Sequence, residues 1–133
     1  MIQLSKKWGY ALKAILYIAE KSPKILKIKD ISLDLNISES LLRRIIASLE
    51  KWDLIQTIKG RTWGVLLKKE LKEISIYNIL KFSWEKLWIT TCTSWLDCSN
   101  KENCNTTIVL WNLQKSFNSI LKLYTLDKMI NKK

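Results

Sequence analysis

The scarcity of residues that allow tight turns restricts the fold of this chain more than any other feature, because 133 residues contain only three glycines and one proline. A many-stranded sheet needs frequent tight turns, in which glycine and proline are among the commonest residues. Helices need far fewer of them. Hydrophobic residues make up 47 % of the chain, which is enough for a buried core. The sequence therefore predicts a mainly α-helical protein with a small amount of β structure.

Three helices are predicted in the first fifty residues. Apolar side chains recur every three or four positions over residues 6–20, which is the periodicity of an amphipathic helix. A shorter helix is predicted over residues 27–35, and residues 36–37 form a turn. Ser38 can then cap a third helix over residues 39–51, whose leucines and isoleucines share one face.

A β-hairpin is predicted after the third helix. Residues 54–58 and 64–68 are short β-prone runs on either side of a tip that contains Gly60. Trp63 lies in this tip and is interpreted as an anchor that holds the hairpin in the core. A helix, a short helix, a third helix and a hairpin, in that order, are typical of a winged helix-turn-helix, which we expect to occupy residues 1–70.

The net charge points to a polyanionic partner. Twenty-three Lys+Arg against 12 Asp+Glu give +11 at pH 7, a charge that attracts nucleic acid or an anionic membrane surface. Two adjacent arginines in the third helix lie away from its apolar face, where they can donate to guanine or phosphate. The alternative is an ordinary solvated face on a lysine-rich protein. The residues predicted to contact double-stranded DNA, in this helix and at the hairpin tip, are Ser38, Ser40, Arg43, Arg44, Lys59 and Arg61.

Residues 71–133 are predicted to form a second unit. A helix is expected over residues 76–88, followed by a loop over residues 89–105 and a long helix that begins near Thr106. Apolar residues of the long helix recur at intervals of three and four, as in a coiled-coil seam. We interpret this helix as the interface of a homodimer; the alternative is that the seam covers the chain's own first unit. The seam residues are Leu110, Leu113, Phe117, Ile120 and Tyr124.

All three cysteines lie in the predicted loop, at Cys92, Cys98 and Cys104, in the pattern C-x5-C-x5-C. No apolar run reaches the roughly 18–20 residues that span a bilayer. Because the N-terminus also does not resemble a signal peptide, we expect a cytoplasmic protein without a membrane partner, whose thiols stay reduced. An odd number of clustered thiols favours a ligand set or a redox thiol over a disulfide framework. Thiolates bind iron–sulfur clusters, zinc or copper(I), and the spacing alone leaves these choices open.

Together these motifs resemble the family of winged-helix regulators that includes the iron–sulfur biogenesis regulator IscR and the nitric-oxide sensor NsrR. The resemblance covers nearly the whole chain, and the three cysteines have the spacing and position of the family's cluster ligands. It implies a repressor or activator whose iron–sulfur cluster controls the binding of a homodimer to a palindromic operator. The other residues that carry the resemblance are Leu4-Ser5, Tyr10-Ala11-Leu12, Asp30-Ile31-Ser32, Ile37-Ser38 through Leu41, Lys59-Gly60, Gly64 and Leu66-Leu67.

The resemblance leaves open the fourth cluster ligand and the choice between a 2Fe–2S and a 4Fe–4S cluster. IscR-like members have a histidine three residues after the third cysteine, where this chain has Thr107, and the chain contains no histidine. NsrR-like members use an aspartate from the partner's N-terminal helix, and the matching position here is Gly9. Asp97, Glu102, a threonine hydroxyl, a small thiol or water are the remaining candidates. An exchangeable fourth position suits a sensor of iron, oxygen or nitric oxide.

Two other functions fit the sequence. A thiol-redox or zinc-dependent regulator keeps the DNA-binding unit and needs no cluster. A small iron–sulfur carrier or electron-transfer protein would use its basic surface to dock an acidic partner. An enzyme is not expected, because the chain lacks histidine, a glycine-rich phosphate loop and a nucleophile with a credible base.

Overall fold

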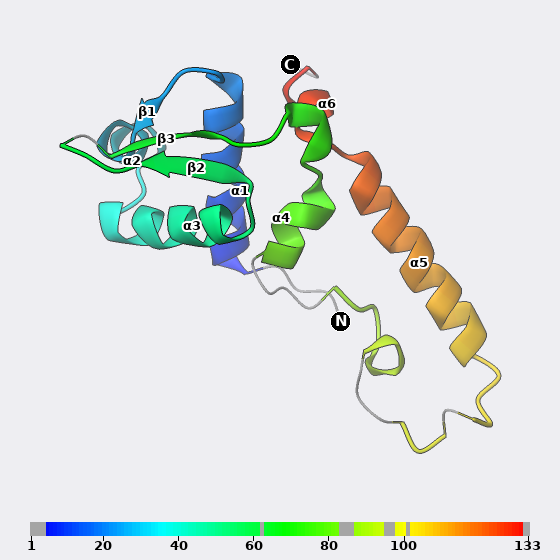
Figure 1. Cartoon of the computed structure of the whole chain (residues 1–133). Coiled ribbons are helices and arrows are strands. Elements are labelled where there is room, and N and C mark those ends of the chain that lie inside the picture. Colours follow the sequence, from blue (N-terminus) through cyan, green and yellow to red (C-terminus); the bar gives the residue numbers. More distant parts are fainter. Residues whose placement is uncertain (1–4, 62, 83–86, 95–97, 101, 132–133) are drawn as a thin grey trace.

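The computed structural model describes residues 5–61, 63–82, 87–94, 98–100 and 102–131. In these ranges helices dominate and are joined by a small three-stranded antiparallel sheet, so the predicted fold class is confirmed. None of the helices in these ranges has the length and apolar composition needed to span a bilayer. The elements in chain order are α1 (Lys6–Glu20), β1 (Leu26–Lys27), α2 (Ile28–Leu35), α3 (Glu39–Lys51), β2 (Ile55–Ile58), β3 (Gly64–Leu67), the 3-10 helix η1 (Leu71–Glu73), α4 (Ile76–Phe82), the 3-10 helix η2 (Thr91–Thr93), α5 (Thr107–Leu123) and α6 (Leu126–Ile130) (Figure 1).

The first three helices form where the sequence predicts them. Two of them begin at serine caps: the Ser5 hydroxyl accepts a hydrogen bond from the Trp8 amide at 3.4 Å, and the Ser38 hydroxyl accepts one from the Leu41 amide at 3.4 Å. α2 ends at Asn36, whose backbone is left-handed (φ 53°, ψ 46°). Asparagine tolerates this conformation better than most residues do. The resulting turn joins α2 to α3 as a helix-turn-helix.

One hydrophobic core holds the helices and the sheet together. Ile15 of α1 and Leu42 of α3 are fully buried in it. Removing a side chain of this size from water contributes roughly 1.5–3 kcal/mol to stability. Ile74, Ile79 and Leu126 belong to the same cluster of buried residues. The elements around α4 and α6 therefore pack directly on the winged helix-turn-helix.

The sheet has the order β1-β3-β2, so β3 is its central strand. β2 and β3 form the predicted hairpin. β1 was not predicted, because its two residues are too few to show an alternating pattern. In β1, Leu26 pairs with Val65 and Lys27 pairs with Gly64. A Cβ atom on Gly64 would lie 2.6 Å from the Cγ2 atom of Ile25. A side chain at position 64 would therefore have to displace the Ile25 side chain, which is 53 % exposed.

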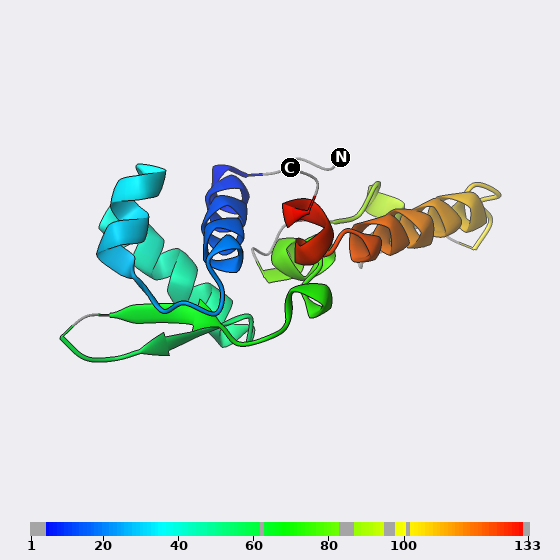
Figure 2. The ribbon, with the colours of Figure 1, turned by 90° about the horizontal axis from the view of Figure 1, so that it is seen from above.

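α5 extends away from the winged helix-turn-helix and is joined to the rest of the molecule mainly at its C-terminal end (Figures 1 and 2). The Ile76 amide donates to the Tyr124 carbonyl at 2.9 Å, and the Leu126 amide donates to the Ile74 carbonyl at 2.9 Å. The start of α5 and the described part of the cysteine loop therefore lie far from the β2–β3 hairpin (Figure 2).

Two predictions for the second half of the chain are wrong in detail. The helix predicted over residues 76–88 ends at Phe82, residues 83–86 lie outside the described ranges, and Leu87 and Trp88 are not helical. The physical reason is that the Leu87 carbonyl accepts a hydrogen bond from the side chain of Gln114 in α5 instead of entering a helix. The five residues of α6 are too few to show helical periodicity, and the sequence analysis missed them.

Candidate nucleic-acid interface and cysteine loop

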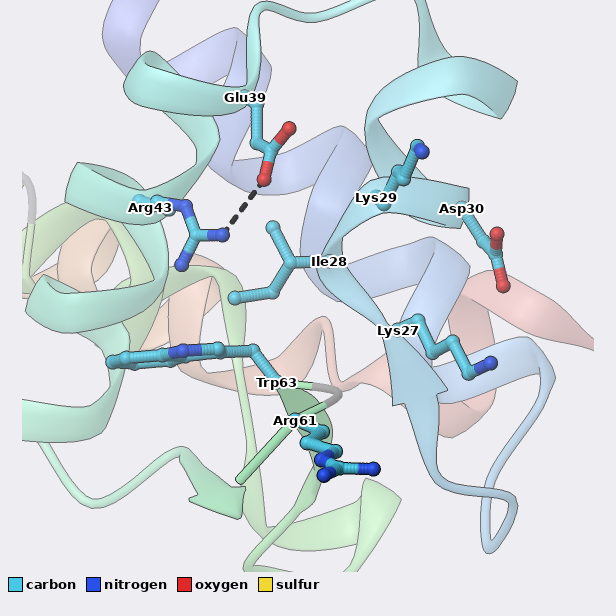
Figure 3. Close-up of a pocket in the computed structure, with 8 residues that line it drawn as sticks. All are labelled: Lys27, Ile28, Lys29, Asp30, Glu39, Arg43, Arg61 and Trp63. Atoms are coloured by element: carbon cyan, nitrogen blue, oxygen red, sulfur yellow. Dashed lines mark hydrogen bonds and ion pairs between the residues drawn. The ribbon is translucent and has the colours of Figure 1, made fainter. Parts of the chain in front are cut away.

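A basic groove lies between α3, the start of α2 and the tip of the β2–β3 hairpin (Figure 3). Its volume is about 390 Å³. Two lysines and two arginines line it against one aspartate and one glutamate, so its net charge suits a polyanion. The lining residues are Lys27, Ile28, Lys29, Asp30, Glu39, Arg43, Arg61 and Trp63.

Two neighbours hold Arg43 in this groove. Its Nη2 atom lies 2.7 Å from Glu39 Oε1, one turn earlier on α3. Its guanidinium carbon lies 5.1 Å from the centre of the Trp63 ring, and Figure 3 shows that ring lying across the groove beneath Arg43. Trp63 is 42 % exposed, so the prediction that it anchors the hairpin in the core is wrong. The core position in this strand is taken by Val65, which is fully buried.

All six residues predicted to contact DNA are exposed. The groove brings Arg43 of α3 together with Arg61 of the hairpin, although 18 positions separate them in sequence. The Ser38 hydroxyl is used to cap α3, so its position is set by the helix start. For all six residues, contact with DNA stays a prediction. The remaining three, Ser40, Arg44 and Lys59, lie outside the lining of this groove.

Sequence analysis missed Lys27 and Lys29, which add positive charge to the groove. They flank Ile28, which is 2 % exposed and fixes this stretch in the core. The alternation of two exposed lysines around a buried isoleucine was a usable signal. It could not be placed beside the hairpin without knowing that β1 pairs with β3.

The three cysteines are free thiols in separate parts of the loop. Cys92 is half-buried within η2, Cys98 is exposed, and Cys104 is half-buried shortly before α5. Within the described ranges, histidine, cysteine, aspartate and glutamate side chains do not gather in any group of three that could hold a metal ion. The chemistry of the three thiols fits an iron–sulfur cluster or zinc, but binding either would require the loop to bring them closer together.

Cys104 lies beside two threonines at the start of α5. Its Sγ atom is 3.0 Å from Thr106 Oγ1. Hydrogen bonds from Thr106 and Thr107 lower the pKa of the Cys104 thiol to about 7, because they stabilise the thiolate. A thiolate is the form that binds metals and reacts with oxidants.

Gln114 connects the turn that contains Cys92 to α5, and sequence analysis missed it. The side chain is 6 % exposed. Its Oε1 atom accepts a hydrogen bond from the Ile89 amide at 2.7 Å, and its Nε2 atom donates to the Leu87 carbonyl at 2.6 Å and to Asn118 Oδ1 at 3.1 Å. The Thr93 hydroxyl lies 3.1 Å from the same Oε1 atom. The segment before and after Cys92 is therefore tied to the middle of the long helix.

Comparison with known sequences identifies related regulators along the whole chain. NsrR of Halalkalibacterium halodurans, described as an HTH-type transcriptional regulator, is 30 % identical over 132 residues, which cover 97 % of this chain and 90 % of that protein. IscR of Pectobacterium atrosepticum, with the same description, is 29 % identical over 133 residues, or 99 % of this chain and 81 % of that protein. Protein aau3 of Rhizobium meliloti is 26 % identical over 131 residues, or 97 % and 85 %.

Solved structures and a family model agree with these relatives. CymR, the global cysteine regulator of B. subtilis, superposes with a TM-score of 0.80 at 19 % identity, covering 100 % of this chain and 99 % of that one. IscR of T. potens gives a TM-score of 0.69 at 22 % identity, covering 98 % and 88 %. The model of the Rrf2 family, described as "Iron-dependent Transcriptional regulator", matches residues 4–132. The chain therefore belongs to the Rrf2 family of transcriptional regulators, which bind DNA and are not enzymes.

Proposed function

We propose that this Rrf2 protein is a cytoplasmic transcriptional regulator that senses iron, redox state or nitric oxide through an iron–sulfur cluster bound by Cys92, Cys98 and Cys104. The observation that carries the proposal is the placement of three free thiols on one loop at the start of α5. Relatives named NsrR and IscR, and the iron-dependent description of the family, support it.

The fourth ligand is the least constrained part of this proposal. The chain has no histidine, so an imidazole of this protein cannot fill the position. Among the described candidates, the Thr106 hydroxyl lies 3.0 Å from Cys104 Sγ, and Thr107 also hydrogen-bonds to this thiol. Glu102 is exposed, and Asp97 lies outside the described residues. A cluster with one weakly held iron would supply the position that oxygen or nitric oxide attacks, whether it is 2Fe–2S or 4Fe–4S.

The DNA-binding part of the proposal places α3 in the major groove and the β2–β3 hairpin against the neighbouring phosphates. Arg43 is presented to the bases or phosphates by the Trp63 ring and Glu39, and Arg44 is exposed beside it. Replacing both arginines with alanine should weaken binding to a specific DNA site by about 100-fold, since each such contact contributes roughly 1–3 kcal/mol.

A matched control removes the same charge elsewhere. Lys13 of α1 and Lys115 of α5 are exposed and do not line the groove. The Lys13→Ala/Lys115→Ala variant should lose less than about threefold in affinity at physiological salt, because charges beyond a Debye length from the DNA are screened. Equal losses in the two double variants would mean that the arginine face of α3 has no special role.

A homodimer is the proposed assembly, and α5 is its proposed interface. Of the predicted seam, Leu113, Ile120 and Tyr124 are exposed, whereas Leu110 and Phe117 are half-buried on the side of α5 that faces α4 and η2. The exposed face also carries Val109 and Leu123, each more than half exposed. An apolar face of this kind is typical of a protein–protein contact. A symmetric dimer would present two copies of α3 to a palindromic operator. Sedimentation equilibrium should give a dimer for the wild type and a monomer for Leu113→Asp/Ile120→Asp.

The experiment that tests the cluster is an absorption spectrum with iron and sulfide assays on protein purified without oxygen. We expect visible bands and stoichiometric iron and sulfide, both lost in Cys92→Ala. A Ser99→Ala variant, which changes an exposed side chain of the same loop, should keep them. A colourless wild type without iron or sulfide after attempted reconstitution would rule out the cluster.

A thiol-redox or zinc-dependent regulator is the second candidate. The observation that favours it is the Cys104 thiol, whose lowered pKa of about 7 makes it reactive at neutral pH without any cluster. In that case peroxide should change DNA affinity in iron-free protein, and Cys104→Ser should abolish the change. An iron–sulfur carrier, in contrast, would show no preference for any DNA sequence.

A further inference from the structure

Hydrogen bonds connect the turn that contains Cys92 to α5. Gln114 uses both N–H groups of its carboxamide as donors, to the Leu87 carbonyl and Asn118 Oδ1. Its oxygen accepts from the Ile89 amide and lies within bonding distance of the Thr93 hydroxyl. A carboxamide has two hydrogens and two lone pairs, so the bonding capacity of Gln114 is filled.

Thr93 carries the effect of Gln114 to the residue next to Cys92. Its hydroxyl lies 2.9 Å from the Thr90 carbonyl and 3.3 Å from the Thr90 amide, and its own amide donates to the same carbonyl at 3.1 Å. These contacts close the turn in which Cys92 lies. Because the hydroxyl has one hydrogen, it donates either to the Thr90 carbonyl or to Gln114 Oε1 at any moment.

The long helix therefore holds two of the three thiols at different positions along its axis. Cys104 is tied to the start of α5 through Thr106. Cys92 is tied to its middle through Gln114, seven residues after Thr107, which is about two helical turns. Cys98, which is exposed, lies between them in sequence.

We propose that Gln114 is a positioning residue for the cluster site: its hydrogen bonds to residues 87, 89 and 93 hold Cys92 at a fixed place beside α5. The ligand role of the thiols in this inference rests on the proposed function. The hydrogen-bonded connection between Gln114 and the Cys92 turn does not rest on the proposed function.

The hydrogen bonds between Gln114 and the Cys92 turn can break and form again, which suits a conformational switch. A buried carboxamide without partners is unfavourable, so the loss of the bonds to residues 87, 89 and 93 requires that water replaces them. Leu113, the neighbour of Gln114 in sequence, is 51 % exposed on the face proposed for dimerisation. A movement of the Cys92 turn would be transmitted through Gln114 to the face of α5 proposed for dimerisation.

The test compares Gln114→Met, which keeps the length of the side chain and removes its hydrogen bonds, with Asn112→Leu, which removes an exposed amide from the same helix. In reduced, iron-free protein, the alkylation rate of each cysteine by iodoacetamide is measured by mass spectrometry. We expect Cys92 to react at least about threefold faster in Gln114→Met, since several hydrogen bonds of the turn are lost. The rates of Cys98 and Cys104 should stay the same, and Asn112→Leu should match the wild type at all three cysteines.

Gln114→Glu provides a second variant in case Gln114→Met does not fold. It keeps the acceptor for the Ile89 amide but loses the donors to the Leu87 carbonyl and Asn118 Oδ1 and places a carboxylate against both oxygens, so we again expect a rise at Cys92. An unchanged Cys92 rate in the folded variants would overturn the inference. A parallel rise at Cys92 and Cys104 would overturn it too, because general unfolding would then be the cause.

A second measurement connects Gln114 to the cluster. In protein reconstituted without oxygen, the visible absorption should decay several-fold faster under a chelator in Gln114→Met than in Asn112→Leu. Equal decay rates would overturn the role of Gln114 toward the cluster. If the wild type takes up no iron and sulfide, the proposed function fails, and the alkylation rates still decide whether Gln114 fixes Cys92.

Discussion

The two ends of this molecule are built in different ways, as helices α3 and α5 illustrate. α3 has 13 residues and buries four aliphatic side chains, Leu42, Ile45, Ile46 and Leu49. α5 has 17 residues, and its one buried residue is Gln114. The winged helix-turn-helix is therefore stabilised within the chain, whereas the helix beside the cysteines keeps much of its apolar surface exposed.

Under the proposed function, this difference favours the cysteine end as the part of the molecule that responds to a signal. Regions with few buried apolar contacts open at a lower free energy than a packed core does. The cysteine turn is held by hydrogen bonds, each worth roughly 0.5–1.5 kcal/mol net. Ligand binding at such a turn can shift its conformation without unfolding the DNA-binding unit. The test with the largest expected effect makes the same leucine-to-alanine substitution at each end of the molecule.

Leu42→Ala should lower the free energy of unfolding by about 3 kcal/mol, because it leaves a cavity in the core. Leu42 is fully buried, whereas Leu113 of α5 is 51 % exposed. Leu113→Ala, measured by urea denaturation in dilute protein where monomer dominates, should cost less than about 1 kcal/mol. Similar losses for the two variants would show that α5 is as tightly packed as α3.

The second prediction concerns the pH dependence of Cys104 in iron-free, reduced protein. Its pKa is lowered from 9.0 to about 7, so the reactive thiolate forms as the pH rises through 7 and disappears below it. Alkylation of Cys104 should be half-maximal near pH 7. Thr106→Val should raise that midpoint and slow alkylation at pH 7 by roughly fivefold, because the hydroxyl that stabilises the thiolate is gone. Thr106→Ser, which keeps a hydroxyl, should match the wild type; a midpoint unchanged by Thr106→Val would contradict this reading.

The third prediction tests the close approach at the sheet. Gly64→Ala should lower stability by about 1 kcal/mol, since its Cβ atom would meet Ile25 Cγ2 at 2.6 Å and the Ile25 side chain must move. Gly60→Ala is the matched control, because a Cβ atom there meets nothing within 4 Å. Thermal denaturation would distinguish the two variants. An equal loss of stability at both glycines would show that contact with Ile25 does not explain the effect.

The smallest expected effect is at the hairpin. Trp63→Ala should weaken DNA binding by about threefold, because an exposed cation–π contact of this type is worth roughly 0.5–1 kcal/mol. The loss should shrink in an Arg43→Ala background, as a double-mutant cycle would measure. If the two losses simply add, the Trp63 ring does not act through Arg43.

Much of the winged helix-turn-helix could be predicted from local sequence alone. The bounds of α1 and α3 match their predictions because serine caps and apolar periodicity act over a few neighbouring residues. β1 could not be predicted, since its two residues depend on pairing with β3, nearly forty positions later. The position of the Trp63 ring depends on tertiary structure in the same way.

The candidate site was predicted less completely for the same reason. The three cysteines and the basic residues are visible in the sequence, but the partners of Gln114 lie 21 to 27 positions away in a segment without periodicity. One local signal was present. Gln114 lies on the helical face that also carries Leu110, Phe117 and Leu121, and a polar residue on an apolar stripe indicates a buried hydrogen-bonding role.

The most direct test of the central claim is the affinity of one dimer preparation for a specific DNA site, measured with and without its cluster. The site would be selected by the protein from a random DNA library, and both forms would be assayed without oxygen at the same salt concentration. We predict at least about a tenfold difference in Kd between the two forms, within the usual range of coupling between two sites, and no difference in Cys92→Ala. Equal affinities in the presence of a demonstrated cluster would contradict the account.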